Sequence, residues 1–189
     1  TALGDLEGRP PVTRGGARPG DVVAVAGSLG WSGGGLVLYL AGRTPPQLHR
    51  DSDEADKAVA TLMWSHRQPT AAWSSGPVAA QAGATAMLDV SDGLVRDLGR
   101  VARASGVRVE LDGQALRVQA DGPLTRALGA DEALVQVLSG GEEHSLVATF
   151  APADVPAGWQ VLGSCAAGEP AVLVDGTAPE VIGWDHFRG

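Results

Sequence analysis

A short apolar run that passes directly into an amphipathic segment constrains the fold of this chain more than any other feature. Residues 85–90 (TAMLDV) are apolar and follow a glycine, which predicts a buried strand. In residues 94–104 the apolar side chains recur at helical spacing on one face, and Gly106 suits the left-handed position that ends a helix. A strand that leads straight into a helix predicts that the helix packs in a layer on a sheet.

The rest of the chain continues this alternation of strands and helices without a strict period. Residues 107–111 alternate Val and Leu with Arg and Glu, as a half-buried strand does. We also expect strands at 21–27, 145–150, 160–164 and 171–175, and helices at 36–40, 54–64, 77–82 and, in part, 121–138. The pattern predicts an α/β (α+β) fold, in which a mixed sheet is layered with helices, rather than a doubly wound sheet.

Charge and cysteine usage exclude several classes of function. The net charge is −8 and Lys57 is the only lysine, which argues against a nucleic-acid surface because phosphate backbones need clustered cations. No apolar run approaches the ~20 residues that span a bilayer, so we expect no membrane segment. Cys165 is the only cysteine, which rules out an internal disulfide and fits a reducing compartment, the cytoplasm.

The first candidate site lies where the predicted strand at 85–90 meets the predicted helix (DVSDGL, residues 89–94). A helix start favours anions such as phosphate, and Mg²⁺ accepts carboxylates together with phosphate oxygens. Asp89 and Asp92 are therefore candidate magnesium ligands beside a bound phosphate. The simpler interpretation is that Ser91 or Asp92 only caps the helix. Two aspartates, a serine and a glycine together favour the site.

Three further stretches are candidates for ligand contacts. In residues 139–144 (SGGEEH), adjacent glycines let a loop approach a ligand, but a turn with solvated acids explains them equally well. The glycine cluster at 27–35 follows a strand and precedes a helix, yet it lacks the Gly-Lys-Ser/Thr of a P-loop. The ending GWDHF (183–187) is too apolar to extend into water, so we expect it to dock on the body. Docking alone explains its composition, and Trp184 would also be available to stack on a planar cation.

Taken in order, these stretches resemble the thiamine-monophosphate kinase family, within the superfamily of aminoimidazole ribonucleotide synthetases. The segment VTRGGARPGD (12–21) resembles the one that leads into the second domain of that superfamily, and AMLDVSDGL (86–94) resembles the hallmark of the kinase. Residues 139–147 stand where the family has a Gly-Gly-Glu-Asp-Tyr-Glu-Leu loop, and 183–187 resemble its Gly-Tyr-Asp-His-Phe ending.

The resemblance implies transfer of the ATP γ-phosphoryl group to thiamine monophosphate, with Mg²⁺ and in a homodimer. Asp92 would be catalytic and, with Asp89, would bind metal. Ser91, Glu142 and Trp184 would contact the substrate. Residues 1–26 would be the end of the N-terminal ATP-binding domain and its junction, and residues 27–189 the C-terminal α/β domain.

Two departures from the family pattern qualify this expectation. Glu143, His144 and Ser145 replace the usual Asp-Tyr-Glu, so the substrate contacts of this loop differ in detail. The ATP-binding loops and the remaining metal-binding aspartates of the family lie upstream of Thr1, so we expect this chain alone to be inactive. The alternatives are another ATP-dependent enzyme of the superfamily, such as a selenophosphate synthetase or a hydrogenase-maturation protein, and a fragment that binds a phosphorylated ligand without catalysis.

Overall fold

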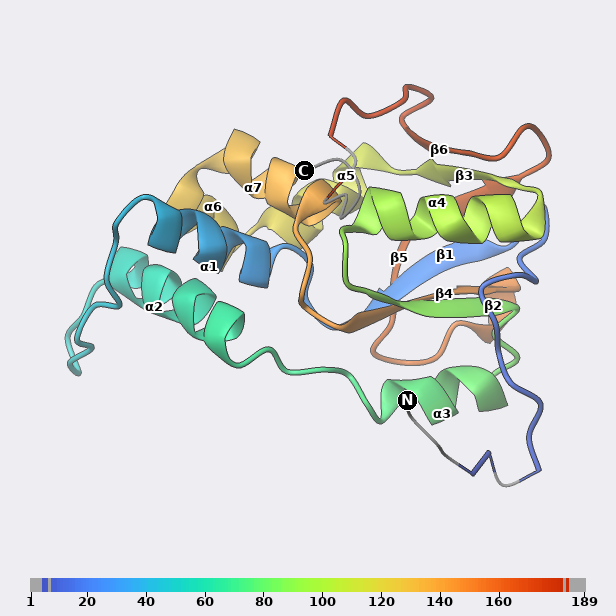
Figure 1. The fold of residues 1–189 in the computed structure, drawn as a ribbon, viewed down its shortest axis with the longest axis horizontal. Coiled ribbons are helices and arrows are strands. Elements are labelled where there is room, and N and C mark those ends of the chain that lie inside the picture. Colours follow the sequence, from blue (N-terminus) through green and yellow to red (C-terminus); the bar gives the residue numbers. More distant parts are fainter. Residues whose placement is uncertain (1–4, 7, 182, 184–189) are drawn as a thin grey trace.

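A six-stranded mixed sheet forms the centre of the computed structural model, which describes residues 5–6, 8–181 and 183 (Figure 1). The strand order is β2-β4-β1-β5-β3-β6, and every neighbouring pair is antiparallel except β3 with β6. The strands are β1 (Val22–Ala26), β2 (Ala86–Val90), β3 (Arg108–Leu111), β4 (Ser145–Phe150), β5 (Gln160–Ala166) and β6 (Ala171–Val174). The predicted fold class is therefore confirmed.

Alternation along β1 gives the sheet two apolar faces. Val23 and Val25 enter the larger core, whereas Ala24 and Ala26 enter a smaller cluster on the other face. The domain boundary predicted between residues 26 and 27 stays a prediction, but β1 itself lies within the sheet, between β4 and β5.

Helices cover the first face and the space beside it. They are α1 (Trp31–Leu40), α2 (Glu54–Arg67), α4 (Leu94–Ser105), α5 (Gly113–Ala120), α6 (Pro123–Leu128) and α7 (Ala130–Ser139). Helix α4 runs along the sheet and buries Leu94, Leu98 and Val101 in the larger core, while α1, α2, α6 and α7 gather beside it (Figure 1, left). The first face therefore carries most of the buried apolar surface.

The second face of the sheet is covered more thinly. Helix α3 (Ser75–Gln81) packs Ala79 against it, and Phe150 stacks edge-on with Trp159 at a ring separation of 5.2 Å. The helix predicted for 77–82 therefore exists but begins two residues earlier, at Ser75. None of the helices among the described residues is long and apolar enough to cross a membrane.

The glycine cluster differs most from its sequence prediction. The sequence predicted a helix from Leu36, but α1 begins at Trp31 and contains Gly33, Gly34 and Gly35. Glycine disfavours a helix interior by roughly 1 kcal/mol relative to alanine, so a loop was the natural expectation. The glycines are needed for close packing on α2, because a Cβ at Gly35 would lie 2.2 Å from the Leu62 carbonyl oxygen.

Candidate functional site

A pocket of about 590 Å³ lies where the four candidate stretches of the sequence meet. These stretches contribute, in chain order, residues 32–33, 91–92, 139–142 and 183. Leu36, Val37 and Leu40 of α1 form an apolar wall beside them. Ser32 reaches across to α2, where its hydroxyl lies 3.1 Å from Nδ1 of His66, which also lines the pocket. The pocket thus combines an apolar wall with polar groups from three separate turns.

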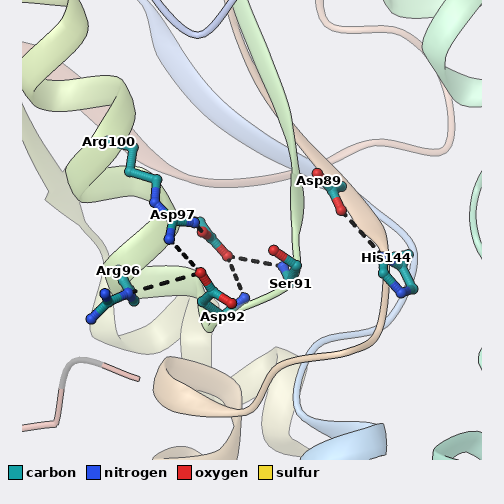
Figure 2. Close-up of polar contacts among 7 residues, drawn as sticks. All are labelled: Asp89, Ser91, Asp92, Arg96, Asp97, Arg100 and His144. Atoms are coloured by element: carbon teal, nitrogen blue, oxygen red, sulfur yellow. Dashed lines mark hydrogen bonds and ion pairs between the residues drawn. The ribbon is translucent and has the colours of Figure 1, made fainter. Parts of the chain in front are cut away.

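The turn between β2 and α4 is held by a carboxylate to which the sequence assigned no role of its own. Asp97 is fully buried, and its Oδ2 accepts hydrogen bonds from the backbone N–H groups of Ser91 and Asp92, each at 2.9 Å (Figure 2). Burial raises the pKa of Asp97, and the two N–H donors and Arg100 oppose that shift. Asp97 follows Leu94 by one helical turn, so an acid on the apolar face of the predicted helix was the signal available in the sequence.

Asp92 is bound to arginines of α4. Its Oδ2 accepts a hydrogen bond from Nη2 of Arg100, and Nε of Arg96 lies 3.9 Å from the same oxygen. Arg100 also donates through Nη1 to Asp97, so one guanidinium bridges two carboxylates (Figure 2). Its hydrogen bond to Asp92 raises the pKa of Arg100, which therefore stays charged.

The simpler interpretation, that Ser91 or Asp92 caps helix α4 with its side chain, does not match the structure. The N-cap of α4 is Gly93, and no side chain caps this helix. Neither Ser91 nor Asp92 is therefore a side-chain cap. Instead, their own N–H groups are bound by Asp97 from inside the helix.

The loop at 139–144 packs directly against this turn. The N–H of Glu142 donates to the Ser91 carbonyl at 2.9 Å, and the N–H of His144 donates to the Val90 carbonyl at 3.2 Å. A Cβ at Gly141 would lie 2.2 Å from the Ser91 carbonyl oxygen, so only glycine fits there. Glu142 and His144 adopt left-handed backbone angles, with φ of 66° and 54°. The structure therefore brings the two acidic motifs of the sequence side by side.

Glu143, between these two residues, is a second buried carboxylate to which the sequence assigned no role of its own. Its side chain is buried, and Oε1 accepts hydrogen bonds from the N–H groups of Ser32 at 2.8 Å and Gly33 at 3.4 Å, at the start of α1. Its Oε2 is buried without a hydrogen-bond partner among the described residues. Burial raises the pKa of the Glu143 carboxyl to about 7, although the α1 N–H groups oppose this. Nothing in the SGGEEH sequence distinguishes which of its two glutamates is buried.

Asp89 lies apart from Asp92. It is exposed, and its carboxylate contacts Nδ1 of His144 at 3.2 Å, well separated from the arginine cluster in Figure 2. Asp89 and His144 line a second pocket of about 380 Å³ with Trp73 and Met87, on the thinly covered face of the sheet. The two aspartates that the sequence placed in one metal site thus have different partners.

The chain alone does not supply a metal site in the part that the structure describes. There, no three or more His, Cys, Asp or Glu side chains lie close enough to hold an ion. Asp89 and Asp92 each offer a single carboxylate. Magnesium ligation by either one therefore needs further ligands.

The chain ending supplies part of the pocket. Val181 packs on the larger core and Gly183 lines the pocket, where a Cβ would lie 2.2 Å from the Asp92 carbonyl oxygen. Trp184, the predicted aromatic contact, lies outside the described residues.

This chain is similar to known proteins in both sequence and fold. Residues 18–163 match the family model described as AIR synthase related protein, C-terminal domain. The chain is 43% identical to a thiamine-monophosphate kinase of Mycobacterium tuberculosis, over 99% of this chain and 53% of the relative. Its fold matches a structure described as AaThiL complexed with AMPPCP and TMP, with a TM-score of 0.72 and 30% identity over 93% of this chain and 54% of that one.

A second structure agrees. The thiamine-monophosphate kinase of Stenotrophomonas maltophilia has a TM-score of 0.70 and 30% identity, over 89% of this chain and 54% of that chain. The chain spans about half the length of the curated relatives it matches.

Proposed function

This chain belongs to the AIR synthase related proteins, as their C-terminal domain, and from that premise we propose that it is the C-terminal part of a thiamine-monophosphate kinase. In the intact protein, the reaction would transfer the γ-phosphoryl group of ATP to thiamine monophosphate and give thiamine diphosphate. Support comes from the relatives named above and from one structural observation. All four candidate stretches converge on a single pocket of about 590 Å³, which is within the usual size range of small-ligand sites.

The pocket suits a phosphorylated cationic ring. The thiazolium ring of thiamine is planar and positively charged, so an apolar wall with nearby carboxylates complements it. We assign the ring to the side formed by α1 and Glu142, and the phosphate to the Ser91–Asp92 turn. Trp184 is our candidate for stacking on the ring.

The residues of this chain would act by binding and orientation. Phosphoryl transfer needs alignment of donor and acceptor and compensation of charge, with little covalent work by the protein. Ser91 would donate its hydroxyl to the acceptor phosphate, and Asp92 would be the catalytic carboxylate at that position. Mg²⁺, when bound, would neutralise phosphate charge. Asp89 and Asp92 would each contribute one ligand, with the remaining ligands outside the described residues.

The other elements of the proposal concern the whole protein. The similar structure named above is described as complexed with AMPPCP and TMP, and we propose ATP as the co-substrate here. We further propose that the intact protein is a homodimer, that it is located in the cytoplasm and that it acts in thiamine biosynthesis. This chain alone would bind ligand without turning it over, because its described carboxylates do not form a metal site.

The test is conversion of thiamine monophosphate to thiamine diphosphate by the intact parent protein, with ATP and Mg²⁺, beside this chain. We expect turnover by the parent and none by the chain. Asp92→Asn in the parent should lower kcat by about a hundredfold or more, whereas Asp51→Asn, at an exposed aspartate that does not line the pocket, should leave it unchanged. A folded, metal-replete parent without turnover would exclude the substrate assignment, and full activity of Asp92→Asn would exclude the role of Asp92.

A further inference from the structure

The Ser91–Asp92 turn is fixed by two side chains that do not line the pocket themselves. We propose that Asp97 and Arg100 are positioning residues, which hold this turn in the geometry that the ligand requires. The inference rests on the proposed function for its kinetic consequence, but its structural content can be measured without any substrate.

Asp97 fixes the backbone of the turn from below. Its side chain is 1% exposed, and one oxygen receives both N–H groups of the turn while the other receives Arg100. A buried carboxylate costs several kcal/mol unless its oxygens are hydrogen-bonded. Because its bonds go to Ser91 and Asp92, any movement of the turn would leave this charge without compensation. The turn therefore has one low-energy position.

Arg100 fixes the side chain of Asp92. Its planar guanidinium binds the carboxylates of Asp92 and Asp97 through different nitrogens, a geometry that a single ammonium group cannot reproduce. Without Arg100, Asp92 would keep Arg96 at 3.9 Å, but the carboxylates of Asp92 and Asp97, with side-chain exposures of only 11% and 1%, would lose the cation that bridges them. Repulsion between them would then push the turn outward.

The position of this turn sets two further parts of the pocket wall. Gly141 packs on the carbonyl of Ser91, and Gly183 packs on the carbonyl of Asp92. Both glycines line the pocket, so a displaced turn displaces the loop at 139–142 and the chain ending together. The bonds of Asp97 and Arg100 thus determine the shape of the pocket on three sides.

The decisive variant in the intact parent is Arg100→Lys, which keeps the charge on an accessible side chain. We expect an unfolding temperature close to that of wild type but kcat about tenfold lower, because one ammonium cannot hold both carboxylates. Arg100→Gln should lower kcat further. Arg103→Gln, one turn later on the same helix and exposed, is the matched control and should stay within about twofold of wild type. A purely structural role for Arg100 would change the unfolding temperature and leave kcat intact.

Amide hydrogen exchange gives a readout that needs no substrate. In Asp97→Asn, which keeps the side-chain shape, the amides of Ser91 and Asp92 should exchange at least about tenfold faster, while the amides of β4 stay protected. If the parent shows no turnover, the proposed function fails, but this exchange result still decides whether the turn is held by Asp97. Unchanged exchange in Asp97→Asn, or wild-type kcat in both Arg100 variants, would overturn the inference.

Discussion

Two of the segments that meet at the pocket, the turn at Ser91–Asp92 and the loop at 139–144, are held in place by different physical means. The turn at Ser91–Asp92 is fixed by charged side chains of α4, which bind both its N–H groups and its carboxylate, that of Asp92. The loop at 139–144 is fixed by close backbone packing at Gly141, by left-handed residues and by a single buried carboxylate, Glu143. One segment therefore depends on electrostatic pairing and the other on steric fit.

This difference predicts how each segment tolerates change. Loss of one charged partner weakens the turn, because its buried carboxylates keep their charge but lose hydrogen bonds. The loop is limited by size, since a Cβ at Gly141 would lie 2.2 Å from the Ser91 carbonyl oxygen and would have to displace backbone. The following three predictions test the loop side of this contrast, in order of decreasing effect.

The largest effect is expected from Gly141→Ala. The new methyl group would overlap the Ser91 carbonyl oxygen, so we expect a loss of about 3 kcal/mol in the free energy of unfolding, measured by denaturant titration. The matched control is Gly76→Ala in α3, where the nearest atom would be a Leu146 methyl at 3.6 Å. That variant should be neutral or slightly stabilising. If Gly141→Ala leaves the free energy of unfolding unchanged, close packing at Gly141 does not hold the loop in place.

An intermediate, pH-dependent effect is expected from Glu143→Gln. The folded-state pKa of Glu143 is about 7, above its ordinary value of 4.5, so the folded protein holds a proton that the unfolded chain has released. Stability therefore falls as pH rises between these two values, by roughly 2 kcal/mol from pH 5 to pH 7. The neutral glutamine can still accept the N–H of Ser32 and should remove that part of the pH dependence. Denaturant titrations at several pH values provide the measurement. If the free energy of unfolding of the variant changes with pH as it does in wild type, the pH dependence belongs to another group.

The smallest effect is expected at the Asp89–His144 pair. Its side chains are 52% and 43% exposed, and ion pairs in such positions contribute less than about 1 kcal/mol. His144→Asn should therefore leave stability nearly unchanged, and asparagine tolerates the left-handed backbone of this position. If thermal unfolding shifts strongly, the pair holds the loop by charge as well, and the two segments differ less than the contacts indicate.

The elements that could be read from the sequence are those with a local cause. The strand Ser145–Phe150 and the helix ending at Gly106 follow from apolar runs bounded by turn residues. Helix α5 was missed, although Asp112 caps it, because its residues show only a weak apolar period. The convergence of the candidate stretches could be suspected from the family resemblance but not from the residues themselves.

The contacts of each site residue could be identified only from the structure. Asp89 and Asp92 are three residues apart, and no local rule states that one faces His144 while the other meets Arg100. The burial of Glu143 depends on the start of α1, which is more than a hundred residues earlier in the chain. Catalytic and binding roles for Asp89, Ser91, Asp92, Glu142 and Trp184 stay predictions.

The place of β1 in the sheet has a consequence for how this protein is made. Both hydrogen-bonded neighbours of β1 lie at least 120 residues later in the chain, so the middle strand forms only after long loops close. At ordinary rates of translation, β1 leaves the ribosome on the order of ten seconds before β4 is complete. During that time VVAVA is an apolar segment with neither of its partner strands available for pairing.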